Sequence, residues 1–242
     1  MALVKICGLK SAKAASHALD SGADLTGIIL VPNRARTVEV AEAAEISRVV
    51  RARRAAFSRE FPNSNVLWQH LQSLDLNEES WSAHVAETLK QNGPFLVGVF
   101  RNQSLDEINS MVDQIGLDFV QLHGSEDPEV YIPGIKVPVI RRITVDQPIE
   151  VLLAEVNSKK HLLALLDSEL GGEGKTVDWG RAHLLGETGG RYLLAGGLTP
   201  DNVGEALKNS GTLGVDVSGG VETNGTKDFD KIAMFVKNAK SG

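Results

Sequence analysis

Short apolar runs that alternate with amphipathic segments constrain the fold of this chain more than any other feature. Eight such runs, rich in valine, isoleucine and leucine, begin at Leu3, Leu25, Phe95, Phe119, Val137, His161, Tyr192 and Thr212. Segments of helical period follow at residues 11–19, 38–56, 80–91, 105–115, 149–156, 201–207 and 228–238. The runs are continuously apolar, which is typical of parallel strands covered by helices. The pattern therefore predicts an α/β fold built from repeated βα units.

Repeated βα units of this number fit either a closed barrel or an open doubly wound sheet. A dinucleotide-binding sheet has the motif G-x-G-x-x-G after its first strand, whereas this chain has Cys7-Gly8-Leu9-Lys10-Ser11 there. The length of 242 residues is also close to what one eight-stranded barrel needs. We therefore predict a TIM barrel, a parallel (β/α)8 barrel, in which residues 1–242 form a single domain.

The interval between the second and third runs departs from this regularity. Their first residues, Leu25 and Phe95, are 70 residues apart, whereas the other intervals are 18 to 31 residues. We predict an insertion or elaborated connection after the second helix, at about residues 52–93, that replaces or encloses the usual third βα step. A locally packed extension is favoured, because long connections grow at low entropic cost. Trp68 and Trp81 in this segment would cover the flank of the barrel or form a partner surface.

The charge and composition of the chain limit its location and its partners. The net charge of −6 disfavours a polyanionic partner such as a nucleic acid or an anionic membrane surface. No apolar run reaches the length of a membrane-spanning helix, and the first residues do not resemble a cleavable signal. The single cysteine excludes an intrachain disulfide and fits a reducing compartment. These features predict a soluble cytoplasmic protein without a nucleic-acid or membrane partner.

The residues that end the apolar runs are candidates for function, because TIM-barrel active sites lie at the carboxyl ends of the strands. The seventh and eighth runs end in Ala195-Gly196-Gly197-Leu198 and Asp216-Val217-Ser218-Gly219-Gly220. Small residues let backbone N–H groups approach an anion, and the loops after strands seven and eight often bind phosphate in this fold. Glycine-rich segments also form ordinary turns, but two adjacent ones favour a phosphate site. The predicted phosphate-binding residues are Gly196, Gly197, Ser218, Gly219 and Gly220.

Cys7 and Asp167 end the first and sixth runs and are candidate catalytic residues. Lone cysteines are usually inert apolar residues, but the turn at Gly8 is expected to open a helix whose N-terminus would favour a thiolate. Asp167 follows an apolar strand, where desolvation favours the protonated form of a carboxyl group and therefore a general acid. A capping or ion-paired aspartate is the alternative. The sequence Gly171-Gly172-Glu173-Gly174 predicts a mobile loop over the site.

Charged or hydrogen-bonding side chains occupy further strand-end positions, namely Arg36 in the loop after the second run, Arg101, His123 and Arg141. An exposed arginine is commonly only a solvated charge, and a single histidine is more often structural than catalytic. Arg36 becomes a candidate for binding only if the substrate carries a second anion besides its phosphate.

Seven motifs in order resemble the phosphoribosylanthranilate isomerase family. They are KICGLK, NRARTV, VGVFRNQ, VQLHG, LLDSELGGEGKTVDW, LLAGGLTPDNV and GVDVSGGVETNGTKD, and they cover nearly the whole chain except about residues 52–93. Each motif is modest alone, but seven in the family's order are specific. The last two are most similar to fungal members. The resemblance therefore implies a eukaryotic cytosolic enzyme of tryptophan biosynthesis that is not fused to neighbouring pathway activities.

The resemblance implies an Amadori rearrangement, in which the aminoaldose N-(5-phosphoribosyl)anthranilate becomes the aminoketose 1-(2-carboxyphenylamino)-1-deoxyribulose 5-phosphate. It implies neither a cofactor nor a metal, because the substrate nitrogen serves as the electron sink. By position, Asp167 would be the general acid that opens the ring. Cys7 would be the general base that removes the C2′ proton, and not a covalent nucleophile.

The resemblance also implies which residues bind the substrate. Asp216 would hold the anthranilate nitrogen and Arg36 its carboxylate, although Arg34 competes for the second role. His123 would also contact the substrate. Glu173, where the family more often has threonine or serine, is expected to point outward because a phosphate repels a carboxylate. Family members occur as monomers and dimers, so a monomer or a homodimer is expected.

Two other classes of function remain open from the sequence. Another sugar-phosphate TIM barrel would be an isomerase or epimerase with a different substrate. Histidine-pathway isomerases use two carboxylates, however, where this chain has Cys7, and epimerases bring metal-ligating His and Asp sets that the strand ends here lack. A non-catalytic binding module is the other class, and the intact pair of Cys7 and Asp167 disfavours it.

Overall fold

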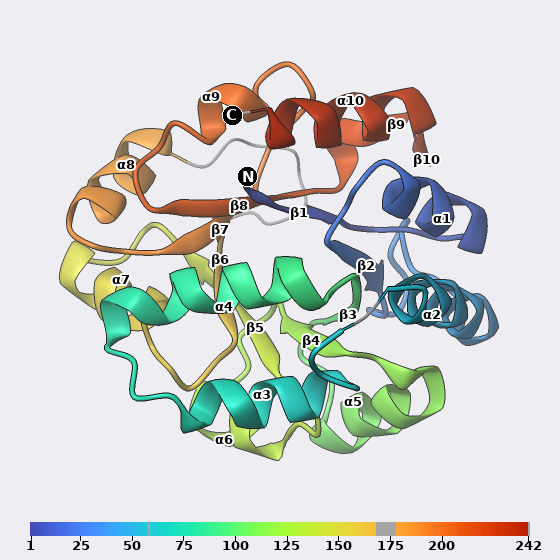
Figure 1. The fold of residues 1–242 in the computed structure, drawn as a ribbon, viewed down its shortest axis with the longest axis horizontal. Helices are drawn as coiled ribbons and strands as arrows, with labels where there is room; N and C mark the ends of the chain where they lie inside the picture. Colours follow the sequence, from blue (N-terminus) through green and yellow to red (C-terminus); the bar gives the residue numbers. More distant parts are fainter. Residues whose placement is uncertain (58, 168–177, 242) are drawn as a thin grey trace.

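The eight predicted strands form a closed parallel barrel (Figure 1) in the computed structural model, which describes residues 1–57, 59–167 and 178–241. Each strand pairs with the next, and β1 (Leu3–Ile6) pairs with β8 (Thr212–Val217), which closes the ring. The others are β2 (Leu25–Ile29), β3 (Phe95–Phe100), β4 (Phe119–Leu122), β5 (Val139–Thr144), β6 (Leu163–Asp167) and β7 (Tyr192–Leu194). The predicted TIM barrel is confirmed.

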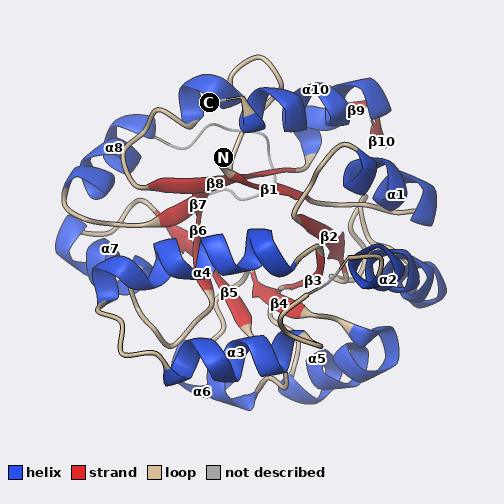
Figure 2. Cartoon of the chain, viewed as in Figure 1, coloured by secondary structure: helices blue, strands red, loops and turns tan. Residues whose placement is uncertain are grey.

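Helices surround the strands (Figure 2). They are α1 (Ala12–Asp20), α2 (Val40–Ala55), α3 (Ser64–Ser73), α4 (Glu78–Asn92), α5 (Leu105–Met111), α6 (Pro128–Gly134), α7 (Ile149–Val156), α8 (Trp179–Glu187), α9 (Val203–Ala206) and α10 (Phe229–Lys240). Each predicted helical segment contains or overlaps one of these helices, whereas α3, α6 and α8 are not among the predicted segments. A π-helical turn, η1 (Val112–Gly116), extends α5. The side chains of Ser11, Asp178 and Asp228 cap α1, α8 and α10 by accepting hydrogen bonds from first-turn N–H groups.

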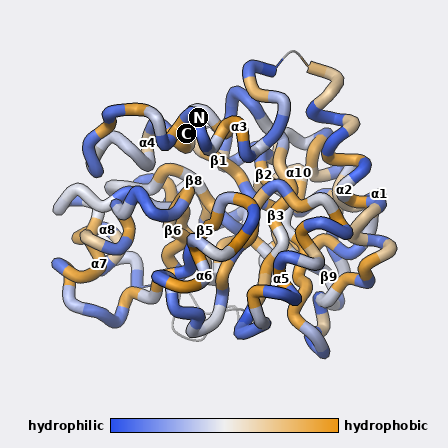
Figure 3. Tube along the Cα trace, turned by 90° about the horizontal axis from the view of Figure 1, so that it is seen from below, coloured by the Kyte–Doolittle hydropathy of each residue, from blue (hydrophilic) through white to orange (hydrophobic). Residues whose placement is uncertain are grey.

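Alternation along the strands divides the side chains into two layers. In β1, Val4 and Ile6 belong to the apolar cluster between strands and helices, whereas Leu3 belongs to the cluster inside the barrel. Because successive side chains in a strand point to opposite faces, Lys5 and Cys7 continue the inward series that begins at Leu3. Figure 3 shows hydrophobic residues concentrated in the central strands. Along the described parts of the chain, we find no helix with the length and hydrophobicity to span a bilayer.

The long connection at about residues 52–93 adds two helices, α3 and α4, to the barrel. Asn63 and Asn77 cap them. Because β3 follows α4 and pairs with both β2 and β4, the connection replaces no strand of the barrel, and its described residues form no further strand. The predicted replacement of the third βα step is therefore wrong, and the alternative of added structure before β3 describes the segment.

The helix α4 lies across the amino-terminal end of the barrel and packs against β1, β6 and β8 (Figure 1). Trp81 is fully buried in the inner apolar cluster together with Leu3 and Leu25, the first residues of their strands. Its ring meets Trp68 edge-on, with 5.8 Å between the ring centroids. Trp81 therefore covers the end of the barrel and not its flank.

Candidate active site

Cys7 directly follows β1, and its side chain is buried at the carboxyl end of the barrel. Its backbone N–H donates to the carbonyl of Val217 in β8 at 2.8 Å. A Cβ placed on Gly27 in the neighbouring strand β2 would lie 2.7 Å from Cys7 Sγ and 3.1 Å from Lys5 Nζ. The thiol and the ammonium group therefore converge on the space that Gly27 leaves.

Lys5 is a functional candidate that the sequence analysis missed. It is fully buried, and its Nζ donates to Asp216 Oδ1 at 2.8 Å. The two residues are register partners in the parallel pair of β1 and β8, so their side chains leave the sheet on the same face. Although burial works in the opposite direction, Asp216 and Cys7 raise the pKa of Lys5 above its usual value. Lys5 is therefore a protonated cation inside the barrel.

The ionisation of Cys7 depends on these charges. The pKa of the Cys7 thiol lies above its usual value, because burial raises it and Asp216 adds to this effect; Lys5 and, more weakly, Lys227 oppose the rise without reversing it. The helix whose N-terminus was expected to favour a thiolate is α1. It begins at Ala12, after its N-cap residue Ser11. Lysine side chains, which the sequence analysis did not consider, therefore supply the positive charge that opposes the effect of burial on the thiol.

Asp167 ends β6 with a buried carboxylate. Arg142 Nε donates to Asp167 Oδ2 at 3.2 Å, and His123 Nε2 lies 3.7 Å from the same oxygen. Burial and the nearby cations Arg142 and Lys5 lower the pKa of His123 to about 3, so its ring is neutral near pH 7. Gln121 Nε2 contacts the other ring nitrogen at 3.3 Å. The structure thus brings the predicted residues Asp167 and His123 together, and it shows the ion-paired aspartate that the sequence left open as the alternative.

Arg142, and not the predicted strand-end residue Arg141, reaches Asp167. Arg141 pairs with Glu155 of α7 at 2.7 Å, in the outer layer. Arg142 shares the inward face of β5 with Ile140, which belongs to the inner apolar cluster. Strand alternation therefore contained the signal that identifies Arg142.

The two predicted phosphate loops lie against each other. Gly196 and Gly197 have φ of 88° and 65°, in the left-handed region that favours glycine. A Cβ on Gly220 would lie 1.8 Å from the carbonyl oxygen of Leu198, so close packing of the loops requires glycine there. Ser218 Oγ is buried, and the described part of the chain offers it no hydrogen-bond partner. Such a hydroxyl is a candidate donor to a ligand.

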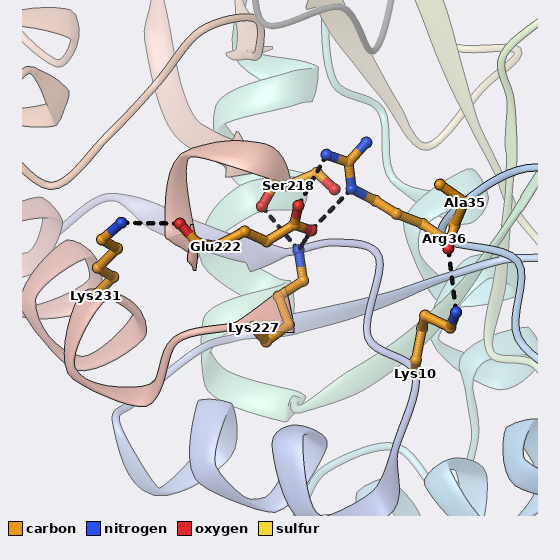
Figure 4. A network of polar contacts seen from close by, with 7 residues as sticks. All are labelled: Lys10, Ala35, Arg36, Ser218, Glu222, Lys227 and Lys231. Carbon is orange, nitrogen blue, oxygen red and sulfur yellow. Dashed lines mark hydrogen bonds and ion pairs between the residues drawn. The ribbon is translucent and has the colours of Figure 1, made fainter. Parts of the chain in front are cut away.

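Arg36 and Glu222 join the loop after β2 to the segment after β8 (Figure 4). Arg36 Nε donates to Glu222 Oε1 at 2.8 Å, and Arg36 Nη2 donates to Oε2 at 2.9 Å. Lys227 Nζ donates to Glu222 Oε1 and to the carbonyl of Ser218, both at 2.7 Å. Although burial opposes ionisation, Arg36 and Lys227 hold the pKa of Glu222 below its usual value. Glu222 is therefore a carboxylate bound by two cations.

The structure distinguishes Arg36 from Arg34. Arg34 is exposed, and its backbone N–H donates to Thr37 Oγ1 at 3.0 Å. Arg36 is partly buried, and a Cβ on Gly219 would lie 3.1 Å from its Nη2. A Cβ on Gly8 would lie 3.0 Å from its Cδ. Arg36 therefore faces the turn after Cys7 and the loop after β8.

Two sequence predictions cannot be placed in this site. The predicted mobile loop Gly171–Gly174 and the expected orientation of Glu173 lie outside the described residues. Among the residues that are described, no three His, Cys, Asp or Glu side chains form a group that could hold a metal ion.

Comparison with known proteins identifies the family of this barrel. The family model of N-(5′-phosphoribosyl)anthranilate (PRA) isomerase matches residues 69–238. The chain belongs to this family. It is 53% identical over 239 residues to the N-(5′-phosphoribosyl)anthranilate isomerase of Komagataella pastoris, with 99% of this chain and 100% of the relative covered. The Saccharomyces cerevisiae enzyme of the same name is 42% identical over 247 residues, with 98% and 94% covered.

Solved structures of the family have the same fold. Phosphoribosyl anthranilate isomerase from Thermotoga maritima matches with a TM-score of 0.72 and 31% identity over the full length of both chains. A phosphoribosyl anthranilate isomerase in complex with reduced 1-(o-carboxyphenylamino)-1-deoxyribulose 5-phosphate matches with a TM-score of 0.70 and 29% identity, again over both full chains. The predicted membership of the family, the likeness to fungal members and the assignment as an isomerase of tryptophan biosynthesis are confirmed.

Proposed function

We propose that this chain catalyses the Amadori rearrangement of N-(5-phosphoribosyl)anthranilate to 1-(2-carboxyphenylamino)-1-deoxyribulose 5-phosphate, with Asp167 as general acid and Cys7 as general base. One observation carries this assignment. Both side chains are buried on the inward face of the barrel at the carboxyl ends of β6 and β1, where TIM barrels perform their chemistry. Because the two strands are not neighbours, the acid and the base can act on different atoms of one substrate.

In the first step, Asp167 donates a proton to the furanose ring oxygen. The bond between this oxygen and C1′ breaks, and the nitrogen lone pair forms an iminium ion with C1′. Arg142, 3.2 Å from the Asp167 carboxylate, stabilises the negative charge that remains after the proton has left. The neutral ring of His123 contributes a hydrogen-bonding group without a further charge.

In the second step, the Cys7 thiolate accepts the proton from C2′. The electrons of the C2′–H bond form a double bond between C1′ and C2′ and neutralise the iminium, which gives an enolamine. Lys5 stabilises the thiolate before this transfer, since its ammonium group lies beside Sγ in a buried site. Tautomerisation adds a proton to C1′ and removes one from the C2′ hydroxyl, which returns Cys7 to thiolate and Asp167 to acid.

The remaining predicted residues bind the substrate in this proposal. Backbone amides around Gly197 and Gly219 hold the phosphate, with the hydroxyl of Ser218 as a further donor. We place the anthranilate nitrogen at Asp216 Oδ2, because Lys5 engages Oδ1, and the anthranilate carboxylate at Arg36. This chemistry uses neither a cofactor nor a metal.

The same proposal locates the protein in the cytoplasm. A thiolate that acts as a base must stay reduced, and reducing compartments preserve thiols. Cys7 is a free cysteine, and the chain has no second one to pair with it.

The reaction is tested by generating N-(5-phosphoribosyl)anthranilate in situ and following the loss of its anthranilate-type fluorescence. The protein should accelerate this loss, and Cys7→Ser should reduce the rate by roughly 10²–10⁴-fold, since a general base contributes about that much. The variant should still bind a reduced product analogue nearly normally. A folded wild-type sample without acceleration would refute the reaction, and a Cys7→Ser variant with most of its rate would refute the base.

A further inference from the structure

We infer that Glu222 is a positioning residue that orients Arg36 toward the carboxylate of the substrate and thereby makes the site selective for N-aryl substrates that carry this carboxylate. The inference rests on the proposed role of Arg36. It assigns a role to a buried carboxylate that neither proton transfer nor phosphate binding uses.

The geometry of the pair fixes the guanidinium plane. Arg36 donates from both Nε and Nη2 to the two oxygens of Glu222, and a bidentate pair of this kind sets the orientation as well as the distance. The Glu222 side chain is 9% exposed and that of Arg36 is 29% exposed. Glu222 is therefore the more deeply buried partner. Arg36 Nη1 donates to neither oxygen of Glu222, and it is the group that we assign to the ligand.

Lysine side chains also bind the backbone at or next to both members of the pair (Figure 4). Lys10 Nζ donates to the carbonyl of Ala35 at 3.1 Å, directly before Arg36, and Lys231 Nζ donates to the carbonyl of Glu222 at 2.8 Å. A free arginine side chain loses rotamer freedom when it binds a ligand. Because Arg36 is already ordered by these contacts, less of that freedom remains to be lost on binding.

The charges around Glu222 explain why a carboxylate is useful there. The short hairpin of β9 (Glu222–Thr223) and β10 (Thr226–Lys227) places Lys227 opposite Glu222, and both side chains are less than a tenth exposed. Without Glu222, the two cations Arg36 and Lys227 would attract any anion. With Glu222 between them, these three side chains carry one net positive charge, and the orientation of the Arg36 guanidinium is fixed. This arrangement favours the binding of a single carboxylate in one defined position.

The test compares two substrates that differ only in the carboxylate, N-(5-phosphoribosyl)anthranilate and N-(5-phosphoribosyl)aniline. The readout is the ratio of their kcat/KM values, with the ketose products quantified by chromatography. Glu222→Gln removes the charge at constant size, and Glu222→Asp keeps the charge but shortens its reach. Arg36→Met removes the proposed ligand group. Glu45→Gln is the matched control, because Glu45 forms an exposed pair with Arg48 on α2.

We expect both Glu222 variants to lower this ratio about tenfold, mainly through a higher KM for the anthranilate substrate, since the effect of one misplaced charged hydrogen bond is of that order. Arg36→Met should lower it at least as much, and Glu45→Gln should not change it. Both substrates are measured on the same preparation, so a reduced folded fraction does not alter the ratio.

Other outcomes separate this inference from the proposed function. A normal ratio in both Glu222 variants with a lowered ratio in Arg36→Met would overturn the role of Glu222 alone. A normal ratio in Arg36→Met would overturn the carboxylate role of Arg36, and equal losses on both substrates would assign Arg36 to the phosphate. A normal ratio in Glu222→Asp but not in Glu222→Gln would show that charge, and not orientation, is what Glu222 supplies.

Discussion

The two ends of this barrel are built from the same eight strands, yet their inward side chains differ in kind. At the amino-terminal end, Leu3, Leu25 and Phe119 form an apolar cluster with Leu71 and Trp81 of the inserted helices. Burial of apolar area is the main favourable contribution to folding. This end therefore contributes chiefly to stability.

At the carboxyl end, the same inward series continues with charged groups. Lys5 pairs with Asp216 inside the barrel, and Arg142 pairs with Asp167. Burying such pairs costs desolvation that offsets much of their attraction, so they are a poor source of stability. The amino-terminal end of the barrel therefore supplies stability and the carboxyl end supplies the chemistry. Mutations at the first end should mainly change the free energy of unfolding, and mutations at the second should mainly change activity.

The largest expected effect is at the carboxyl end, on activity. Asp167→Asn removes the proposed acid, so kcat should fall by roughly 10²–10⁴-fold. The free energy of unfolding should change much less, because the amide oxygen of asparagine can still accept a hydrogen bond from Arg142. The fluorescence assay and urea unfolding of the same preparation measure both quantities. A variant that retains more than a tenth of the wild-type kcat would contradict the acid assignment.

The next effect is at the amino-terminal end, on stability. Trp81→Ala should lower the free energy of unfolding by about 3–5 kcal/mol, because it leaves a cavity under α4. The kcat of the folded fraction should stay close to that of the wild type. As a control, Val66→Ala on the exposed side of α3 should change stability by less than about 0.5 kcal/mol. A loss of kcat in Trp81→Ala without a loss of stability would break the division between the ends.

The smallest effect is a pH dependence that both ends share. Burial lowers the pKa of His161, just before β6, and of His123, just after β4, to about 3. In the unfolded chain a histidine has a pKa of about 6.5. Below pH 6.5 the unfolded state therefore binds a proton at each histidine that the folded state does not bind. The contribution of each histidine to the free energy of unfolding is greatest above pH 6.5 and falls by about 1 kcal/mol per pH unit below it.

Replacing each histidine sharpens the comparison. His161→Gln and His123→Gln should each flatten the decline of unfolding free energy between pH 6.5 and 5, as measured by urea titrations at several pH values. Only His123→Gln should also change kcat, because only His123 lies next to Asp167. If both variants kept the steep decline, neither ring would be neutral in the folded protein.

Local pattern was sufficient to predict the strands and the strand-end residues. Each apolar run is continuous and ends in a distinct polar or glycine-rich motif, so the eight strands and the positions of Cys7 and Asp167 follow from the sequence. Alternation would also have identified Lys5, which shares a face with Leu3 and Cys7, and Arg142, which shares one with Ile140. Neither residue is the last of its run, so the rule that functional residues end the strands does not select them.

Other features depend on long-range contacts that a single sequence does not specify. The pair of Lys5 and Asp216 requires the register between the first and last strands, and that of Arg36 and Glu222 joins segments 186 positions apart. The sequence left Trp81 as a cover for the flank of the barrel or as part of a partner surface, and nothing local in it shows that the barrel end buries this ring.

Gly27 shows that the site limits the size of the residue on the strand next to Cys7. A methyl group at this position would overlap Cys7 Sγ at 2.7 Å and press against Lys5 Nζ at 3.1 Å. The restriction is one of volume, because the backbone of Gly27 does not lie in the left-handed region that only glycine tolerates well. A side chain at position 27 therefore requires Cys7 Sγ to move, so the size of residue 27 and the position of the thiol are coupled across the two neighbouring strands.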